Sequence, residues 1–152
     1  RLTWSIRRAG HPFHLVLLQL AHDSNVIAHG DFAKPEDFHD HVVKGFAEGA
    51  PGHHHLVFKA HPLEDGRIPE ARAIKFIARQ YGVEKRVHYV PGGKLSRLMN
   101  LARSAVTINS TAGQQALWRG IPLRASLVYS SMVNMLTLAS SAAIRMTGML
   151  EA

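Results

Sequence analysis

The chain has 152 residues, 46% of them apolar, and carries 18 basic against 11 acidic side chains, a formal charge of +7. This length predicts one domain with a sizeable core, and the lack of cysteine excludes a disulfide framework and thiolate chemistry. No apolar run approaches the ~20 residues of a membrane span, and Arg1 to Arg8 lacks the apolar core of a signal peptide, so we expect a cytoplasmic location.

Strand and helix patterns alternate along the first half of the chain. The short apolar run at 14–18 predicts a buried strand, and 56–58 predicts the next one. Between them, a helix begins at Pro35 with apolar residues at helical spacing and ends at Gly49. A second helix is predicted over 69–81.

The second half continues the alternation. Strands are predicted at 86–90, 105–108 and 122–125, and helices at 95–102 and 114–119. Regular alternation of this kind predicts an α/β fold, a mainly parallel sheet with helices on both faces.

We place this domain at residues 14–125. The remainder, 126–152, is rich in Ser, Met, Ala and Leu and is expected to form an atypical, helical tail. Ligands of parallel sheets bind at the carboxyl ends of the strands, which directs attention to the polar residues at those ends.

Lys59 and His61 follow the predicted strand at 56–58, and Pro62 keeps His61 out of helical geometry. A cation beside an imidazole suits an anionic, phosphorylated ligand. Lys59 is the expected point charge, with ordinary solvation of a strand-end lysine as the alternative. His61 is the best catalytic candidate, although binding and charge neutralisation are the role we favour, and packing against the Pro62 turn is the alternative.

A second polar cluster runs from Asn109 through Ser110 and Thr111 to Gly113 and Gln114. It leads into a helix amino terminus, where free N–H groups and the dipole favour a phosphate. A plain helix cap without ligand is the alternative.

Gln19, Asp23 and Ser24 come after the first strand, where their side chains are placed to bind sugar hydroxyls. An Asx-turn at Asp23 without ligand is the alternative. No metal site is expected from the 11 histidines, because the run His53-His-His55 would alternate faces of a strand, and His39 and His41 lie two apart on a helix.

The basic surplus favours anionic partners, and ordinary surface charge explains it equally well. The basic residues are scattered, without an arginine-rich arm or interleaved aromatics, so nucleic acid is not an expected partner.

Three blocks resemble one family. They are Leu17-Leu-Gln-Leu-Ala-His-Asp-Ser-Asn-Val26, Phe58-Lys-Ala-His-Pro-Leu-Glu-Asp-Gly66, and Val106-Thr-Ile-Asn-Ser-Thr-Ala-Gly-Gln-Gln-Ala-Leu117 followed by Gly120-Ile-Pro122. In order and separation they are similar to the capsule polysaccharide synthesis and export proteins of Gram-negative bacteria, which include glycosyltransferases that use CMP-activated Kdo.

The resemblance implies one Rossmann-like half of a GT-B-type glycosyltransferase, the carboxyl-terminal half that holds the nucleotide sugar. A CMP-sugar would be a substrate, and no cofactor is implied. The expected partners are the amino-terminal half of such an enzyme and anionic lipid headgroups at the inner membrane. Since Tyr129 is followed by Ser130 where the family pattern has a Tyr-Asp-like pair, the tail departs from the family.

Two alternatives stay open at this point. One is another GT-B-like nucleotide-sugar or glycerophosphate transferase. The other is a non-catalytic basic module coupled to polysaccharide export.

Overall fold

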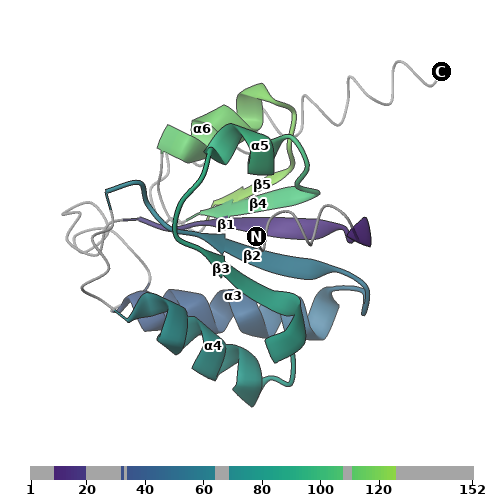
Figure 1. Cartoon of the computed structure of the whole chain (residues 1–152), viewed down its shortest axis with the longest axis vertical. Coiled ribbons are helices and arrows are strands. Elements are labelled where there is room, and N and C mark those ends of the chain that lie inside the picture. Colours follow the sequence, from purple (N-terminus) through teal and green to yellow (C-terminus); the bar gives the residue numbers. More distant parts are fainter. Residues whose placement is uncertain (1–8, 20–31, 33, 64–68, 108–110, 126–152) are drawn as a thin grey trace.

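A parallel sheet of five strands forms the centre of the molecule, in the order β3-β2-β1-β4-β5 (Figure 1). The computed structural model describes residues 9–19, 32, 34–63, 69–107 and 111–125. The strands are β1 (Phe13–Leu17), β2 (His55–Lys59), β3 (Val87–Val90), β4 (Ser104–Thr107) and β5 (Leu123–Ala125). The predicted parallel sheet is confirmed, with each strand close to its predicted position.

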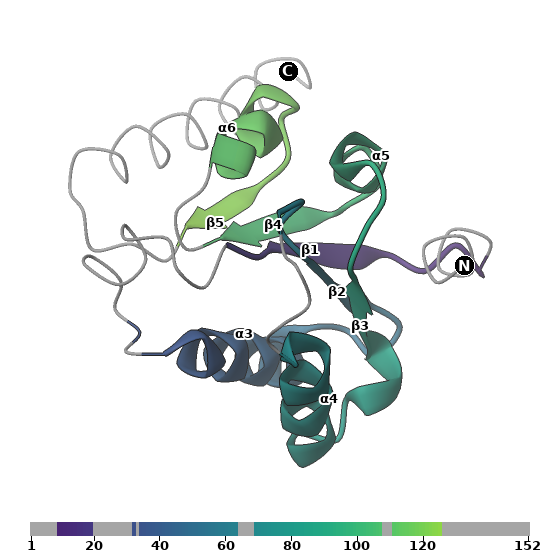
Figure 2. The ribbon, with the colours of Figure 1, turned by 60° about the vertical axis from the view of Figure 1, so that its left-hand side comes forward.

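Helices cover both faces of the sheet, as predicted (Figure 2). They are α3 (Pro35–Gly49), α4 (Glu70–Gln80), α5 (Leu95–Met99) and α6 (Thr111–Trp118). The chain moves outward from β1 through β2 to β3, and then returns to β4 on the other side of β1. Because crossover connections are right-handed, this reversal places α3 and α4 on one face and α5 and α6 on the opposite face.

Residues of β1 supply both halves of the core in alternation. Leu15 and Leu17 pack in the cluster on the α5–α6 face, whereas Val16 packs with Phe38 and Phe58 in the cluster on the α3–α4 face. Leu15 and Val16 are both fully buried. A strand covered on both faces needs a continuous apolar run, which is why the run at 14–18 was a clear strand signal.

Several predicted boundaries need correction. The third strand begins at Val87 because Glu84–Arg86 form a short 3₁₀ helix, and α5 ends at Met99 instead of reaching residue 102. The helix predicted at 114–119 begins three residues earlier, at Thr111. The tail at 126–152 lies outside the described residues, so its helical character stays a prediction.

Gly82 ends α4 in the left-handed region, with φ +69°. Its N–H bonds the Arg79 carbonyl, and the Val83 N–H bonds the Ala78 carbonyl, at 3.1 and 2.9 Å. This pair of bonds is the Schellman motif, in which only glycine escapes the cost of a left-handed backbone.

Two glycine-to-alanine changes are expected to act in opposite directions. Gly82→Ala should destabilise the fold by about 1–2 kcal/mol, since its backbone is left-handed. Gly45→Ala should stabilise it by about 0.5–1 kcal/mol, because Gly45 lies exposed inside α3 with open space around its Cα. Urea unfolding of both variants measures the difference, and shifts of the same sign would contradict the assigned helix end.

Candidate functional site

The carboxyl ends of the three middle strands form one edge where polar residues meet. Leu17, the last residue of β1, pairs with Lys59 of β2 on one side and with Thr107 of β4 on the other. Paired residues of parallel strands point to the same face, so Lys59 and Thr107 share the α5–α6 face with Leu17. They are two strand spacings apart, roughly 10 Å.

Lys59 is the last residue of β2 and is not solvated, since only 4% of its surface is exposed. Its Nζ donates one hydrogen bond of 2.9 Å, to the carbonyl of Ala60. Burial lowers the pKa of the Lys59 ammonium, and within the described part of the chain it forms no ion pair with a carboxylate. Burying an ammonium costs free energy unless its charge and its remaining N–H groups are paired, and an anionic ligand would provide both.

Thr107 is a candidate site residue that the sequence interpretation missed. It is 2% exposed, and its buried Oγ1 has no hydrogen-bond partner among the residues that the structure describes. A buried hydroxyl is normally satisfied, so the missing partner makes Thr107 a candidate contact for a bound ligand. The available signal was a polar residue directly after the apolar pair Ala105 and Val106, at the end of the strand.

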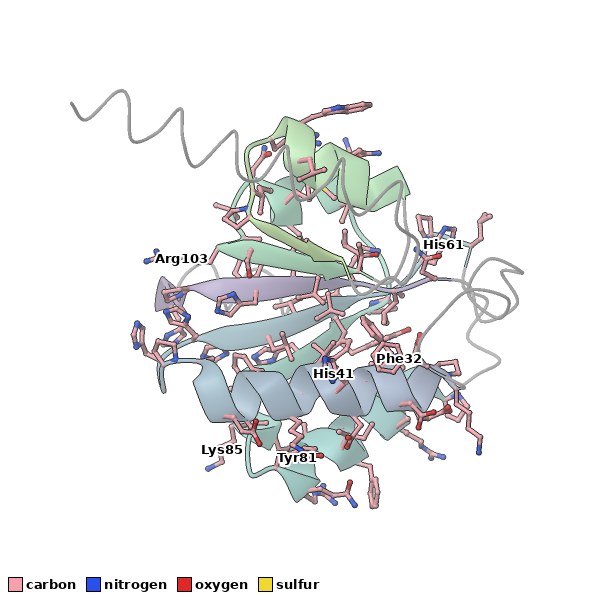
Figure 3. All side chains as sticks on the ribbon, turned by 180° about the vertical axis from the view of Figure 1, so that it is seen from behind. Phe32, His41, His61, Tyr81, Lys85 and Arg103 are labelled. Carbon is pink, nitrogen blue, oxygen red and sulfur yellow. The ribbon has the colours of Figure 1, made fainter. Side chains whose placement is uncertain are left out.

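His61 lies at the same edge of the sheet, opposite the edge that carries Arg103 (Figure 3). The Leu63 N–H donates to Nδ1 of the half-buried His61 ring at 3.2 Å. A neutral ring that accepts at Nδ1 carries its proton at Nε2, which is then the donor open to a ligand. The bond to Leu63, which fits the alternative of packing against the Pro62 turn, therefore leaves Nε2 free for the binding role that we favour.

The second predicted cluster reaches this edge through its backbone. Thr111, Gly113 and Gln114 lie in the first turn of α6, whose leading N–H groups have no partner within the helix. Thr111 and Gly113 are thus helical and not part of the preceding turn. Asn109 and Ser110 lie outside the described residues, as do Asp23 and Ser24, whereas Gln19 is half-buried two residues after β1.

The strand order concentrates these groups at one place. The order in which strands are added to the sheet reverses between β1 and β4, because β2 and β3 lie on one side of β1 and β4 and β5 on the other. Open α/β sheets bind ligands in the crevice at such a switch point. Gln19 follows β1 and α6 follows β4, so they flank this switch point, with Lys59 one strand further along.

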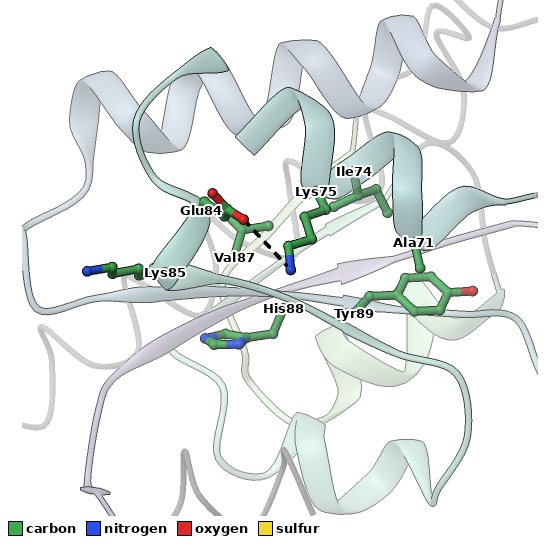
Figure 4. A pocket seen from close by; sticks show the side chains of 8 residues that line it. All are labelled: Ala71, Ile74, Lys75, Glu84, Lys85, Val87, His88 and Tyr89. Carbon is green, nitrogen blue, oxygen red and sulfur yellow. Dashed lines mark ion pairs between the residues drawn. The ribbon is translucent and has the colours of Figure 1, made fainter. Parts of the chain in front are cut away.

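A pocket of about 540 Å³ lies elsewhere, between α4 and the outer strand β3 (Figure 4). Its charged lining is internally compensated, because Lys75 Nζ lies 3.7 Å from Glu84 Oε1. None of the predicted site residues lines this pocket, so its volume does not make it the site.

Histidines gather at the amino-terminal edge of the sheet, which the sequence interpretation also missed. His14 contacts His54 through ring nitrogens 2.9 Å apart, and His55 contacts His88 at 2.8 Å. His11 stacks on His55 with ring centroids 4.5 Å apart. In the described ranges no three His, Asp or Glu side chains are arranged to hold a metal ion.

Burial lowers the pKa of four of these histidines and so favours their neutral form. It lowers the pKa of His14, His54 and His55, with neighbouring charged groups adding to the effect. The pKa of His88 falls furthest, to about 4, through burial and then the His55 charge. When both rings of a close pair are neutral, one ring donates its N–H to the bare nitrogen of the other.

The part of the chain that the structure describes contains no helix of the length and apolarity needed to cross a membrane.

Comparisons with known proteins agree on one family. Residues 5–127 match the model of the family described as capsule polysaccharide biosynthesis protein. The chain is 34% identical to the Escherichia coli capsule polysaccharide export protein KpsS, over 74% of this chain and 29% of KpsS. It is 37% identical to the capsule polysaccharide modification protein LipB of Neisseria meningitidis serogroup A, over 74% of this chain and 27% of LipB.

Solved structures share the fold. The β-Kdo 2,7 transferase KpsC of Thermosulfurimonas dismutans superposes with a TM-score of 0.56 at 15% identity, covering 84% of this chain and 39% of KpsC. MnaA of S. aureus, solved with UDP, gives 0.52 at 15% identity, covering 81% of this chain and 31% of MnaA. At this identity the likeness describes the Rossmann-like architecture alone.

Proposed function

This chain belongs to the capsule polysaccharide biosynthesis protein family, and from that premise we propose that it is the donor-binding half of a GT-B-type glycosyltransferase. The donor is a nucleotide sugar, CMP-Kdo, and the product enters capsular polysaccharide. The chain spans less than a third of the length of the curated relatives it matches. In the proposal, the remaining length of such a protein supplies the acceptor half.

The observation that carries the proposal is the buried ammonium of Lys59 at the carboxyl edge of the sheet. Its pKa is lowered by burial, and a bound phosphate or sugar carboxylate would supply the missing counter-charge. The start of α6 adds N–H groups and the positive end of a helix dipole. These features support an anionic donor more than a neutral sugar.

Each group has a role in the proposed reaction. The acceptor hydroxyl loses its proton to a base in the acceptor half and attacks the anomeric carbon of the donor, the bond from that carbon to the CMP phosphate oxygen breaks, and CMP leaves. Lys59 and the α6 N–H groups stabilise the charge that develops on the phosphate. Nε2 of His61 donates a hydrogen bond to an oxygen of the nucleotide sugar, and the Thr107 hydroxyl forms a hydrogen bond with a sugar or phosphate oxygen.

Titration calorimetry with CMP and with cytidine tests the donor site. We expect a clear gain in affinity from the phosphate, and Lys59→Met should remove about 1–3 kcal/mol of that gain, the range for charge-assisted hydrogen bonds. Met keeps the buried volume without the charge, so we also expect the variant to fold at least as stably as the parent chain.

Lys85→Met is the matched control, because Lys85 is exposed on the 3₁₀ helix that precedes β3, at the amino-terminal end of the strands and away from their carboxyl ends. Equal affinity for CMP and cytidine in the parent chain would overturn the donor assignment. Equal losses in the two lysine variants would attribute the effect to general charge.

A further inference from the structure

The amino-terminal edge of the sheet is a second polar surface, and the proposed reaction makes no use of it. Figure 3 shows Arg103 at this edge, at the opposite end of the sheet from His61. Because the strands lie in the order β3-β2-β1-β4, four neighbouring strands each bring a basic or imidazole side chain here. With neighbouring strands ~4.8 Å apart, the row is roughly 14 Å long. Its members are His88 on β3, His55 on β2, His14 on β1 and Arg103 directly before β4.

Contacts join these side chains into one surface, beginning at β1 and β4. Nδ1 of His14 lies 2.7 Å from Ser104 Oγ, and Nε2 of the same ring lies 2.9 Å from His54 Nδ1. Burial lowers the pKa of both rings, and the charge of the nearby Arg103 guanidinium, which acts on both, lowers it further. Arg103 is exposed and forms no ion pair within the described part of the chain.

Arg86 connects this half of the row with the half on β2 and β3. Its guanidinium donates a hydrogen bond of 3.3 Å to the carbonyl of His54. His55 follows in the chain and contacts the His88 ring through nitrogens 2.8 Å apart. Burial, and then the charges of His11 and Arg86, lower the pKa of His55. The surface is therefore continuous from Arg103 to His88.

The charged groups that face this surface are of one sign. Every charged neighbour that acts on the four histidines is an arginine or another histidine. Glu84 lines the α4–β3 pocket together with His88, Lys75 and Lys85, but both of its oxygens bond to Arg79, at 3.0 and 3.1 Å. Among the described residues, no carboxylate forms an ion pair with the row. An anion that carries several charges would supply the missing counter-charge.

We propose that this surface, defined by His14, His54, His55, Arg86, His88 and Arg103, binds an acidic glycan, a linear chain of sugars that carry carboxylates. The two guanidiniums supply permanent charge for the carboxylates. The imidazoles form hydrogen bonds with sugar hydroxyls when they are neutral and pair with carboxylates when they are protonated. A row along four strand ends also matches an extended polymer better than a compact ligand.

The choice of a glycan rests on the proposed function. The family to which the chain belongs is described as making capsule polysaccharide, and the sugar of the proposed donor carries a carboxylate. In this picture the donor site lies at the carboxyl edge of the sheet and the glycan site at the amino-terminal edge, so both can be occupied at once.

Single-stranded nucleic acid fits this surface less well. Its binding sites combine a basic groove with exposed aromatic rings that stack on the bases. The phenyl ring under the Arg86 guanidinium, that of Phe46, is only 6% exposed and so is not open for stacking. An oligonucleotide is therefore the competing ligand in the test.

Glycan binding at this surface should take up protons. A bound carboxylate favours the imidazolium form, so it raises histidine pKa values that the free chain holds low. Affinity then increases as the pH falls through the range where the histidines are protonated in the complex and neutral in the free chain. The limit is about tenfold per pH unit for each proton taken up.

Fluorescence anisotropy with a labelled oligogalacturonate, which has one carboxylate per sugar, tests the surface between about pH 7.5 and pH 5.5. The carboxylates of this probe stay ionised throughout that range. We expect the affinity to rise at least about tenfold as the pH falls, and a neutral malto-oligosaccharide of the same length not to bind. Calorimetry in two buffers of different ionisation enthalpy should show net proton uptake.

Matched variants locate the contact. Arg103→Gln should weaken oligogalacturonate binding about fivefold, the effect of one lost charge-assisted contact at an exposed position. Arg72→Gln makes the same charge change on an exposed residue in the first turn of α4 and should bind like the parent.

The pH dependence has its own pair of variants. His54→Gln/His88→Gln removes one ring from each close pair and should flatten it, whereas His41→Gln, at an exposed position on α3, should not. Far-ultraviolet circular dichroism and an unchanged CMP affinity confirm that each variant is folded.

A pH-independent affinity, equal binding of the neutral glycan, or equal losses in Arg103→Gln and Arg72→Gln would overturn the proposed surface. So would tighter binding of an oligonucleotide of similar charge. Saturating CMP should not displace the oligogalacturonate, and Lys59→Met should bind it like the parent. Displacement by CMP would place the carboxylates in the donor site and reject this surface. Loss of CMP binding with the glycan still bound would reject the donor site alone, so the two failures are distinguishable.

Discussion

The 152-residue chain, assayed alone with CMP-Kdo and a lipid acceptor, should transfer no sugar above background. The described polar groups, Lys59, His61 and the start of α6, all lie at one edge of one sheet and account for donor binding only. A GT-B-type reaction also needs an acceptor site and usually a general base across the cleft. Positioning of the two reactants can supply roughly 7–11 kcal/mol of the barrier in well-oriented cases, and one half cannot provide it.

Activity should return when the same residues are part of a polypeptide with the facing half. In that longer protein, Lys59→Met should reduce turnover, and Lys85→Met should not. Robust transfer by the 152-residue chain would show that this domain holds the acceptor and the base as well, and that its assignment as one half of an enzyme is wrong.

The second large effect concerns pH, through the histidines at the amino-terminal edge. Their pKa values are lowered in the fold, so the unfolded chain binds more protons as the pH falls below about 6.5. Stability is then complete above the unfolded pKa, is lost as the pH falls, and levels off below the folded pKa, about 4 for His88. After allowance for partial exposure, His88 alone should contribute about 1–2 kcal/mol.

Urea unfolding between about pH 7 and pH 5 measures this loss. The window avoids Glu84, whose pKa is lowered by its hydrogen bond and ion pair with Arg79 and which stays ionised there. His88→Leu should flatten the dependence, whereas His41→Leu, at an exposed position on α3, should leave it intact. A pH profile that is the same in both variants would exclude the His55–His88 pair as its cause.

The fold was predictable where short apolar runs alternate with helical spacing. The run at 14–18 is buried on both faces because it is the central strand, and Phe38, Val43 and Phe46 on α3 are buried at the predicted spacing. Boundaries were less predictable. Thr111 and Gly113 look like turn residues in sequence, but the chain leaving β4 turns at once into α6.

For the candidate site, the sequence predicted the location at the carboxyl edge of the sheet but not the burial or the contacts of its residues. The alternation indicated that Lys59 and the start of α6 lie at the carboxyl ends of the strands, and the structure places them there. The burial of Lys59 and Thr107 depends on the α5–α6 layer above them, which no local pattern reveals. The histidine pairs depend on strand neighbours, since His14 and His54 are 40 positions apart. Sequence spacing alone cannot show that β1 and β2 are adjacent.

The central position of β1 has a consequence for the order of events during synthesis. His14 pairs with Ser104, which leaves the ribosome 90 residues later. Until then, one side of β1 has no strand to pair with, and only the β1-α3-β2-α4-β3 portion can assemble. Chain closure over such distances is slow compared with local helix formation. The nascent domain therefore waits with an open sheet edge until β4 arrives, and that edge is the segment a chaperone would most usefully cover.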